Sequence, residues 1–146
     1  MYTEQLTQGL AVVGYLPPQS LGTGTNTTIT NIDMKKYHRL LVVIQTGSLG
    51  TSATVDAKLR EAKTSGGTYQ DISGKSITQL VKASNDNNLA TIEVRADELD
   101  AGYEFVQLSL TVGTAASQVA ALALAGEANH KPANAGNLAS VVQQVA

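Results

Sequence analysis

Strict alternation of apolar and polar side chains is the feature that most constrains what this chain can fold into. Between positions 53 and 60, four apolar residues alternate with four polar ones, and the segment 104–112 repeats the same pattern. A period of two places alternate side chains on opposite faces of an extended strand. Both segments therefore predict half-buried β-strands.

Further segments have strand-like patterns of other kinds. Leu40–Ile44 is continuously apolar and rich in β-branched residues, which favours a central strand covered on both faces. The segments 27–33 and 89–94 alternate more weakly. The run 119–125 is apolar throughout but rich in alanine, so a helix competes with a strand there.

Turn-forming residues separate these segments at short intervals. The breaks lie at 65–67, 73–74, 84–88, 100–102 and 113–116, and no pattern of an ordinary-length helix lies between them. Short strands joined by short loops are typical of an all-β protein. The sequence predicts an antiparallel β-sandwich or jelly roll of about seven or eight strands.

The two ends of the chain differ from its middle, so we expect an N-terminal arm over 1–26, a sandwich domain over 27–126 and a C-terminal arm over 127–146. The last arm carries apolar residues at i, i+3, i+4 and i+7, which predicts a short helix with Asn137 as its N-cap. So short a helix is marginal alone in water, and therefore it docks on a partner or frays. Apolar residues of both arms are the expected assembly contacts: Leu6, Leu10, Val13, Leu138, Val141, Val142 and Val145.

Composition narrows the classes of function. The 146 residues suit one domain, and ten basic against twelve acidic side chains give a net charge of -2. This balance favours neither nucleic acid nor an anionic membrane surface as a partner. No apolar run reaches the length of a membrane-spanning helix, and the first ten residues lack the pattern of a secretory signal. We therefore expect synthesis in a cytoplasm.

Motifs of catalysis and metal binding are incomplete. Gly74-Lys75-Ser76 resembles the end of a phosphate-binding loop, but the position that needs the first glycine is Tyr69. His38 and His130 have no partner at metal-ligand spacing, and the acidic segment 93–104 does not match a calcium loop. We expect no catalytic residue, no cofactor, no metal and no enzymatic activity.

The order of segments from Arg39 to Gly126 resembles that of a family of small virion structural proteins of tailed bacteriophages, the jelly-roll capsid decoration or minor head proteins. An apolar strand is followed by a Thr-Val-x-Ala-Lys-Leu strand and then by a Ser-Gly-Gly-Thr-aromatic-x-Asp-Ile-x-Gly segment. An Ile-Thr-Gln-Leu strand, a Tyr-x-x-Val-x-Leu-x-Leu-Thr-Val-Gly strand and an Ala/Val/Leu-rich strand complete the series. The corresponding residues are 40–44, 54–59, 65–74, 77–80, 103–113 and 119–126.

This resemblance implies a structural role on the surface of a phage capsid. The chain is then expected to bind the outside of the expanded head and to clamp neighbouring subunits of the major capsid protein. It is also expected to associate with copies of itself, with a trimer favoured because it would match local three-fold positions. A neck, tail or fibre-base component is the alternative. A carbohydrate-binding module is less favoured because the chain has six aromatic residues and no tryptophan.

Overall fold

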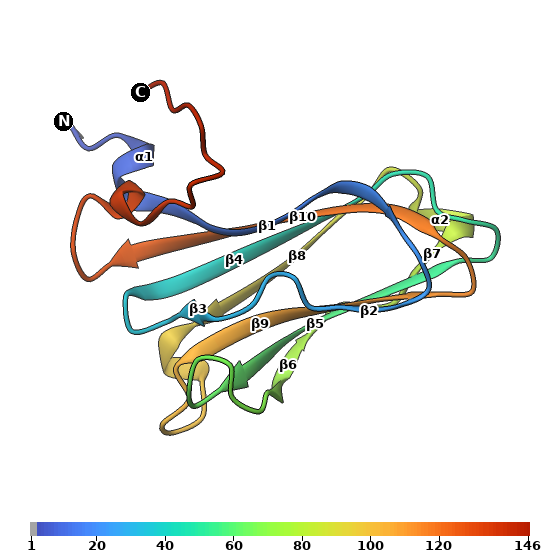
Figure 1. Ribbon diagram of the computed structural model, residues 1–146, viewed down its shortest axis with the longest axis horizontal. Helices are drawn as coiled ribbons and strands as arrows, with labels where there is room; N and C mark the ends of the chain where they lie inside the picture. Colours follow the sequence, from blue (N-terminus) through green and yellow to red (C-terminus); the bar gives the residue numbers. More distant parts are fainter. Residues whose placement is uncertain (1–2) are drawn as a thin grey trace.

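The computed structural model describes residues 3–146 as two antiparallel sheets packed face to face (Figure 1). The four-stranded sheet has the order β1 (Leu10–Leu21), β10 (Ser117–Ala128), β4 (Tyr37–Thr46), β8 (Leu89–Arg95). The second sheet contains β2 (Gly24–Asn26), β3 (Ile32–Asp33), β9 (Phe105–Gly113), β5 (Thr54–Ala62), β6 (Gln70–Ser76) and β7 (Leu80–Val81). The described helices are α1 (Leu6–Gly9), α2 (Lys82–Asn85), and the 3-10 turns η1 (Ala96–Glu98) and η2 (Ala133–Gly136).

The strand pairing is that of a jelly roll. Strands β2 and β3 both pair with β9, and β6 and β7 both pair with β5, so each couple acts as one interrupted strand. Two more pairs of this series are β1 with β10 and β4 with β8. The pairs β10–β4 and β5–β9 then join neighbouring ribbons into the two sheets. The first strand thus pairs with the last, the second with the last but one, and so on inward. Such a rolled double ribbon confirms the predicted all-β, antiparallel sandwich or jelly roll.

The core lies between the sheets, where the predicted alternation places it. The apolar positions of 53–60 are at most 3 % exposed, and the same is true of Val106, Leu108, Leu110 and Val112. The run 119–125, for which a helix competed with a strand, belongs to β10, the neighbour of β4 in the four-stranded sheet. Its alanines at 121, 123 and 125 are buried because they face the core.

Residues 10–21, which were expected in an N-terminal arm, form the edge strand β1 instead. The register of β1 against β10 shifts between Leu16 and Gln19, where Pro17 and Pro18 lie. Proline has no backbone N–H and is tolerated in sheets only at edges or bulges. The two prolines argued against a strand in the sequence, but a strand at the edge of the sheet can accommodate them.

The helix expected over 138–145 does not form, and that prediction is wrong. Asn137 does not cap a helix, because its Oδ1 accepts a hydrogen bond of 2.7 Å from the Val12 backbone N–H. The Leu138 N–H donates to the Val12 carbonyl at 2.9 Å. These two bonds satisfy the free edge of β1, whereas a lone helix of this length has to offset its costly nucleation.

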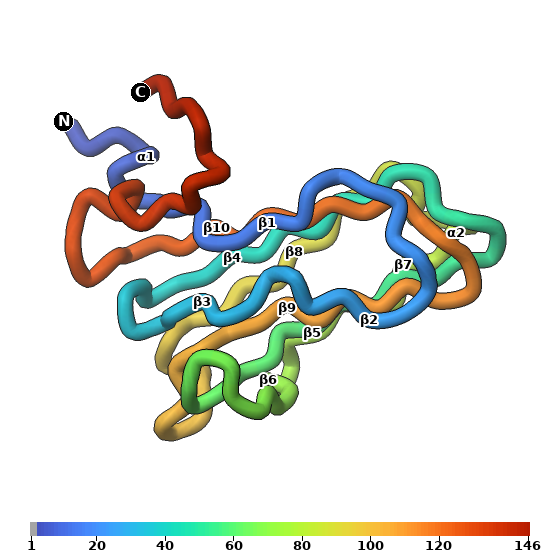
Figure 2. The backbone as a smooth tube through the Cα atoms, in the orientation of Figure 1, coloured from blue at the N-terminus to red at the C-terminus, as the bar shows by residue number. Residues whose placement is uncertain are grey.

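Both chain ends lie at the same end of the sandwich (Figure 2). Helix α1 packs there against η2, and both contact β1. None of the described helices is long and apolar enough to cross a membrane.

Candidate assembly surface

The solvent-facing side of the four-stranded sheet carries apolar side chains where a free sheet normally carries polar ones. Along β4, Leu40, Val42 and Ile44 point into the core and are 0 % exposed, whereas Leu41 and Val43 point outward and are partly exposed. Paired residues of an antiparallel sheet share a face. The register thus aligns Val12, Leu124 and Leu41 in one row, and Tyr15, Leu122 and Val43 in the next.

Together with Leu10, which pairs with Gly126 one row further along, these side chains define the outer apolar face. Its members are Leu10, Val12, Tyr15, Leu41, Val43, Leu122 and Leu124. The continuously apolar run 40–44 predicted a strand covered on both sides, and the described residues cover one side only. Antiparallel sheets that face water ordinarily have one polar side, so this face departs from the usual pattern.

The second sheet has apolar side chains towards the core and polar side chains towards solvent, as is usual for an antiparallel sheet. The outward positions of β5 are Asp56, Lys58 and Arg60, with apolar residues between them facing the core. Asp71 on β6 pairs with Lys58 at 2.6 Å and with Arg60 at 2.9 Å. The hydrogen bond from Lys58, assisted by that from Arg60, lowers the pKa of Asp71. The outer side of the second sheet is thus polar, whereas the outer side of the four-stranded sheet carries apolar side chains on β1, β10 and β4.

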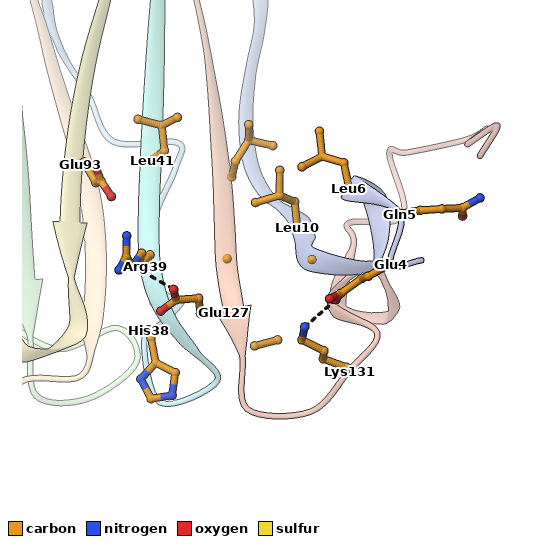
Figure 3. Close-up of a pocket in the computed structure, with 14 residues that line it drawn as sticks. Glu4, Gln5, Leu6, Leu10, His38, Arg39, Leu41, Glu93, Glu127 and Lys131 are labelled. Atoms are coloured by element: carbon orange, nitrogen blue, oxygen red, sulfur yellow. Dashed lines mark hydrogen bonds and ion pairs between the residues drawn. The ribbon is translucent and has the colours of Figure 1, made fainter. Parts of the chain in front are cut away.

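A groove of about 790 Å³ lies at the end of the outer apolar face next to α1. Leu10, Leu41 and Leu124 contribute apolar surface, and Leu6 on α1 faces Glu93 of β8 across the groove (Figure 3). A glycine at 126 keeps the groove open, because a Cβ there would lie 3.3 Å from Leu10 Cδ2. The groove is apolar at its centre and lies within the size range of protein pockets, roughly 300–1,000 Å³.

Charged residues surround the groove as ion pairs. Lys131 Nζ lies 2.5 Å from Glu4 Oε1, and Arg39 Nε lies 3.2 Å from Glu127 Oε1 (Figure 3). All four side chains are substantially exposed, so the pairs add little to stability. Their effect is to neutralise four of the charges on the rim, whereas Glu93, which also lines the groove, takes part in neither pair.

The structure brings only part of the expected contact set to this surface. Leu6, which is 77 % exposed, and Leu10 line the groove, whereas Val13 packs against the core. Val142 and Val145 extend into solvent and are 93 % and 85 % exposed. Leu138 and Val141 are partly buried near the edge of β1.

Sequence reasoning missed the middle of the outer apolar face, namely Leu41, Val43, Leu122 and Leu124. The available signal was that 40–44 and 119–125 are apolar at both odd and even positions. Only the pairing of β4 with β10 shows that their outward residues form one continuous surface.

The histidines and the acidic segment that the sequence analysis considered as possible metal sites lie in a groove wall, a loop and a turn. His38 lines the groove and His130 lies in an exposed loop, and the described residues contain no group of three or more potential metal ligands. In the acidic segment, Glu98 accepts hydrogen bonds from the Arg95 N–H and the Lys75 ammonium, and both lower the pKa of Glu98. These contacts hold the turn after β8.

A buried carboxylate that the sequence did not reveal lies on β5. Glu61 is 2 % exposed, and it accepts hydrogen bonds from Gln70 Nε2 at 2.9 Å and from the Asp100 N–H at 3.1 Å. Tyr103 in turn donates to Gln70 Oε1. These hydrogen bonds connect the loop before β9 with strands β5 and β6, and their donors and acceptors all belong to the protein.

No family model and no curated protein matches the chain. Among solved structures, it is similar to a chain from Bacillus endospore appendages, a novel family of disulfide-linked pili, with 12 % identity and a TM-score of 0.39, covering 85 % of this chain and 93 % of that one. A chain of the heated Israeli acute paralysis virus full particle is 9 % identical at a TM-score of 0.41, with coverages of 85 % and 70 %. A chain of infectious bursal disease virus, Gt strain, is 11 % identical at a TM-score of 0.44, and the match covers 86 % of this chain and 34 % of that one. The strand order of the chain itself defines the jelly roll.

Proposed function

We propose that this chain is a structural protein of a bacteriophage virion, and specifically a capsid decoration protein. It binds the outside of the expanded head and clamps neighbouring subunits of the major capsid protein. The observation that carries this proposal is the outer apolar face, a set of outward-pointing apolar side chains on three adjacent strands of a sandwich whose other surface is polar.

Burial of this face is a driving force for attachment. Removal of apolar surface from water contributes about 25 cal/mol per Å². Rows of Leu, Val and Tyr that cross β1, β10 and β4 offer a surface three strands wide for contact with a shell. Charged residues make up only 15 % of the chain, which limits the desolvation cost of such a contact.

The scaffold suits a clamp rather than a catalyst. A jelly roll is wound from long-range pairs, so its two sheets hold the outer apolar face rigidly in one orientation. The order of segments from Arg39 to Gly126 resembles decoration and minor head proteins, which supports the same role. A fold alone does not define a function, and so the proposal depends on the surface.

Co-sedimentation with matched, expanded, empty phage heads tests the proposal. We expect saturable binding of the parent protein at a ratio that equals the number of one class of symmetry position on the shell. Leu122→Asp should abolish binding because it places a charge in the outer apolar face at a position that does not line the groove. Ser76→Asp, on the outer side of the polar sheet opposite Lys58, is the matched control and should bind like the parent.

Binding of only the few copies that one vertex accommodates would move the protein to the neck, tail or fibre base. Equal binding by Leu122→Asp and the parent would refute the role of the outer apolar face. Absence of binding to heads would refute the decoration role.

A further inference from the structure

The chain contains both a groove without an occupant and an apolar segment without a cover. The groove between α1 and the outer apolar face is lined by Leu6, Leu10, Leu41 and Leu124. The segment is the C-terminal tail, defined here as residues 139–146. Its Val142 and Val145 are almost fully exposed, although a large apolar side chain is ordinarily buried in part.

Charge matches the tail to the groove. The tail contains no charged side chain, only Ala, Ser, Val and Gln. On the rim of the groove, Lys131 pairs with Glu4 and Arg39 pairs with Glu127, so these four charges are neutralised before any occupant arrives. A segment with uncharged side chains adds no further charge to this site, whereas a charged occupant would bring one that the paired rim residues do not match. Glu93 also lines the groove and is in none of these ion pairs, so we expect its carboxylate to stay at the solvent-exposed end of the groove.

The tail does not fill the groove of its own chain. No groove-lining residue lies beyond Lys131. The tail starts from Leu138, which is tied to Val12 at the outer edge of β1, and α1 stands beside the groove as its wall (Figure 3). In the structure the tail turns back on itself, because Asn137 Nδ2 donates a hydrogen bond of 2.9 Å to Gln144 Oε1. Opening of this one exposed bond would let the eight residues extend at about 3.3 Å each, and they would then reach roughly 26 Å beyond the tie, far enough to enter an adjacent molecule.

We propose that the groove binds the C-terminal tail of a second copy of this chain, with Val142 and Val145 inserted beside Leu41 and Leu124. The contact is heterologous, because a tail meets a groove rather than its own equivalent. Repetition of such a contact closes into a ring when the rotation between copies allows it. This inference rests on the proposed function and deepens it, since it names the contact that would join decoration subunits on a shell. The part of the outer apolar face that does not line the groove, Tyr15, Val43 and Leu122, then remains for the capsid.

Sedimentation of the full-length protein over a range of concentrations is the first test. The parent should self-associate. Val142→Asp/Val145→Asp should weaken the dissociation constant by about 10–100-fold, because it replaces two buried anchors. Gln143→Asp adds charge to the same tail at a position that is already polar, and it should associate like the parent.

The groove is tested separately with Leu41→Asp, and Gln45→Asp is its control on the same strand and the same face but outside the groove. Leu41→Asp should be monomeric and Gln45→Asp should associate normally. A thermal melt of each variant shows whether the sandwich has remained folded. Deletion of 139–146 removes the tail without changing any strand, and it gives the same test if Leu41→Asp does not fold.

Mixing separates the proposed contact from a face-to-face dimer. The tail variant keeps its groove and the groove variant keeps its tail, so an equimolar mixture should form one-to-one complexes although neither associates alone. A parent protein that stays monomeric at all concentrations would overturn the proposal. So would a tail variant that associates as the parent does, because the outer apolar face would then meet another face.

The outcome is independent of the capsid test. A parent that binds heads as a monomer refutes the tail contact and leaves the decoration role intact. A parent that associates through its tail but ignores heads refutes the decoration role and leaves the contact intact.

Discussion

Two adjacent residues of β4 give the sharpest test of the structure and of the proposed surface together. Val42 is 0 % exposed and faces the core, with Ala123 and Ile92 as its neighbours on β10 and β8. Leu41 faces outward on the outer apolar face. Val42→Asp and Leu41→Asp therefore place the same charge one residue apart on opposite sides of one sheet.

The expected magnitudes differ widely. A fully buried carboxyl avoids its charge by taking up a proton, because burial raises its pKa by roughly 3–5 units. Protonation of an aspartate at pH 7 costs about 4 kcal/mol, and this is the most that the raised pKa can cost at that pH. Loss of the buried Val42 side chain adds about 1.5–3 kcal/mol. The sum, about 5–7 kcal/mol, is comparable with the whole stability of a domain, about 5–15 kcal/mol. Leu41→Asp keeps its carboxylate in water and should cost about 1 kcal/mol or less.

Thermal melts followed by circular dichroism measure both effects. For a domain of this size, 1 kcal/mol shifts Tm by about 2–4 °C. Leu41→Asp should thus melt close to the parent, whereas Val42→Asp should be unfolded or melt far lower. Because a raised pKa in the folded state penalises the ionised form, the deficit of Val42→Asp should shrink as the pH falls towards 4.

Val42→Asn is the control for the pH dependence, since it is buried and polar but does not titrate. A Val42→Asp variant that melts within a few degrees of the parent would mean that the facing of β4 is wrong. A Leu41→Asp variant that unfolds would mean the same.

Three further predictions concern the polar contacts. Glu61→Ala removes the acceptor of the Asp100 N–H and one of the two acceptors of Gln70 Nε2, and it should cost about 1–3 kcal/mol, read as a Tm lower by about 2–12 °C; an unchanged Tm would show that water replaces the carboxylate. Hydrogen bonds to Asp86, from the Lys82 ammonium first and then the Leu49 N–H, lower its pKa, as do those to Glu98. The stability that each carboxylate contributes is complete above its unfolded pKa near 4, and it is lost as the pH falls through the lower folded pKa. The urea concentration at half-unfolding should therefore decrease when the pH is lowered below 4, and it should decrease less steeply in Asp86→Asn/Glu98→Gln. Asn137→Ala removes the bond to the Val12 N–H and should hasten proteolysis of the C-terminal tail without altering the core, whereas an unchanged cleavage rate would contradict its anchoring role.

The alternation of apolar and polar residues with a period of two was enough to predict most of the fold. Alternation in 53–60 and 104–112 defined which side chains face the core, because the two faces of a strand are set by geometry within a few residues. The turn residues between segments limited the topology to an antiparallel sandwich or jelly roll. These are local properties, and the structure confirms them.

Local pattern failed at both ends of the chain. Pro17 and Pro18 suggested an arm, yet residues 10–21 form an edge strand whose bulge accommodates the prolines. The spacing of Leu138, Val141, Val142 and Val145 suggested a helix, yet hydrogen bonds of Asn137 and Leu138 to Val12 start the tail in a different direction. Both outcomes depend on residues more than a hundred positions away.

The all-β class, the inward side chains of the main strands and the apolar character of 40–44 and 119–125 could all be read from local patterns of residues. The pairing of β10 with both β1 and β4 could not, and this pairing makes Leu10, Leu41 and Leu124 one surface beside a groove. Facing within a strand follows from backbone geometry, whereas neighbours across a sheet are chosen by the free energy of the whole packed core, which no short segment contains.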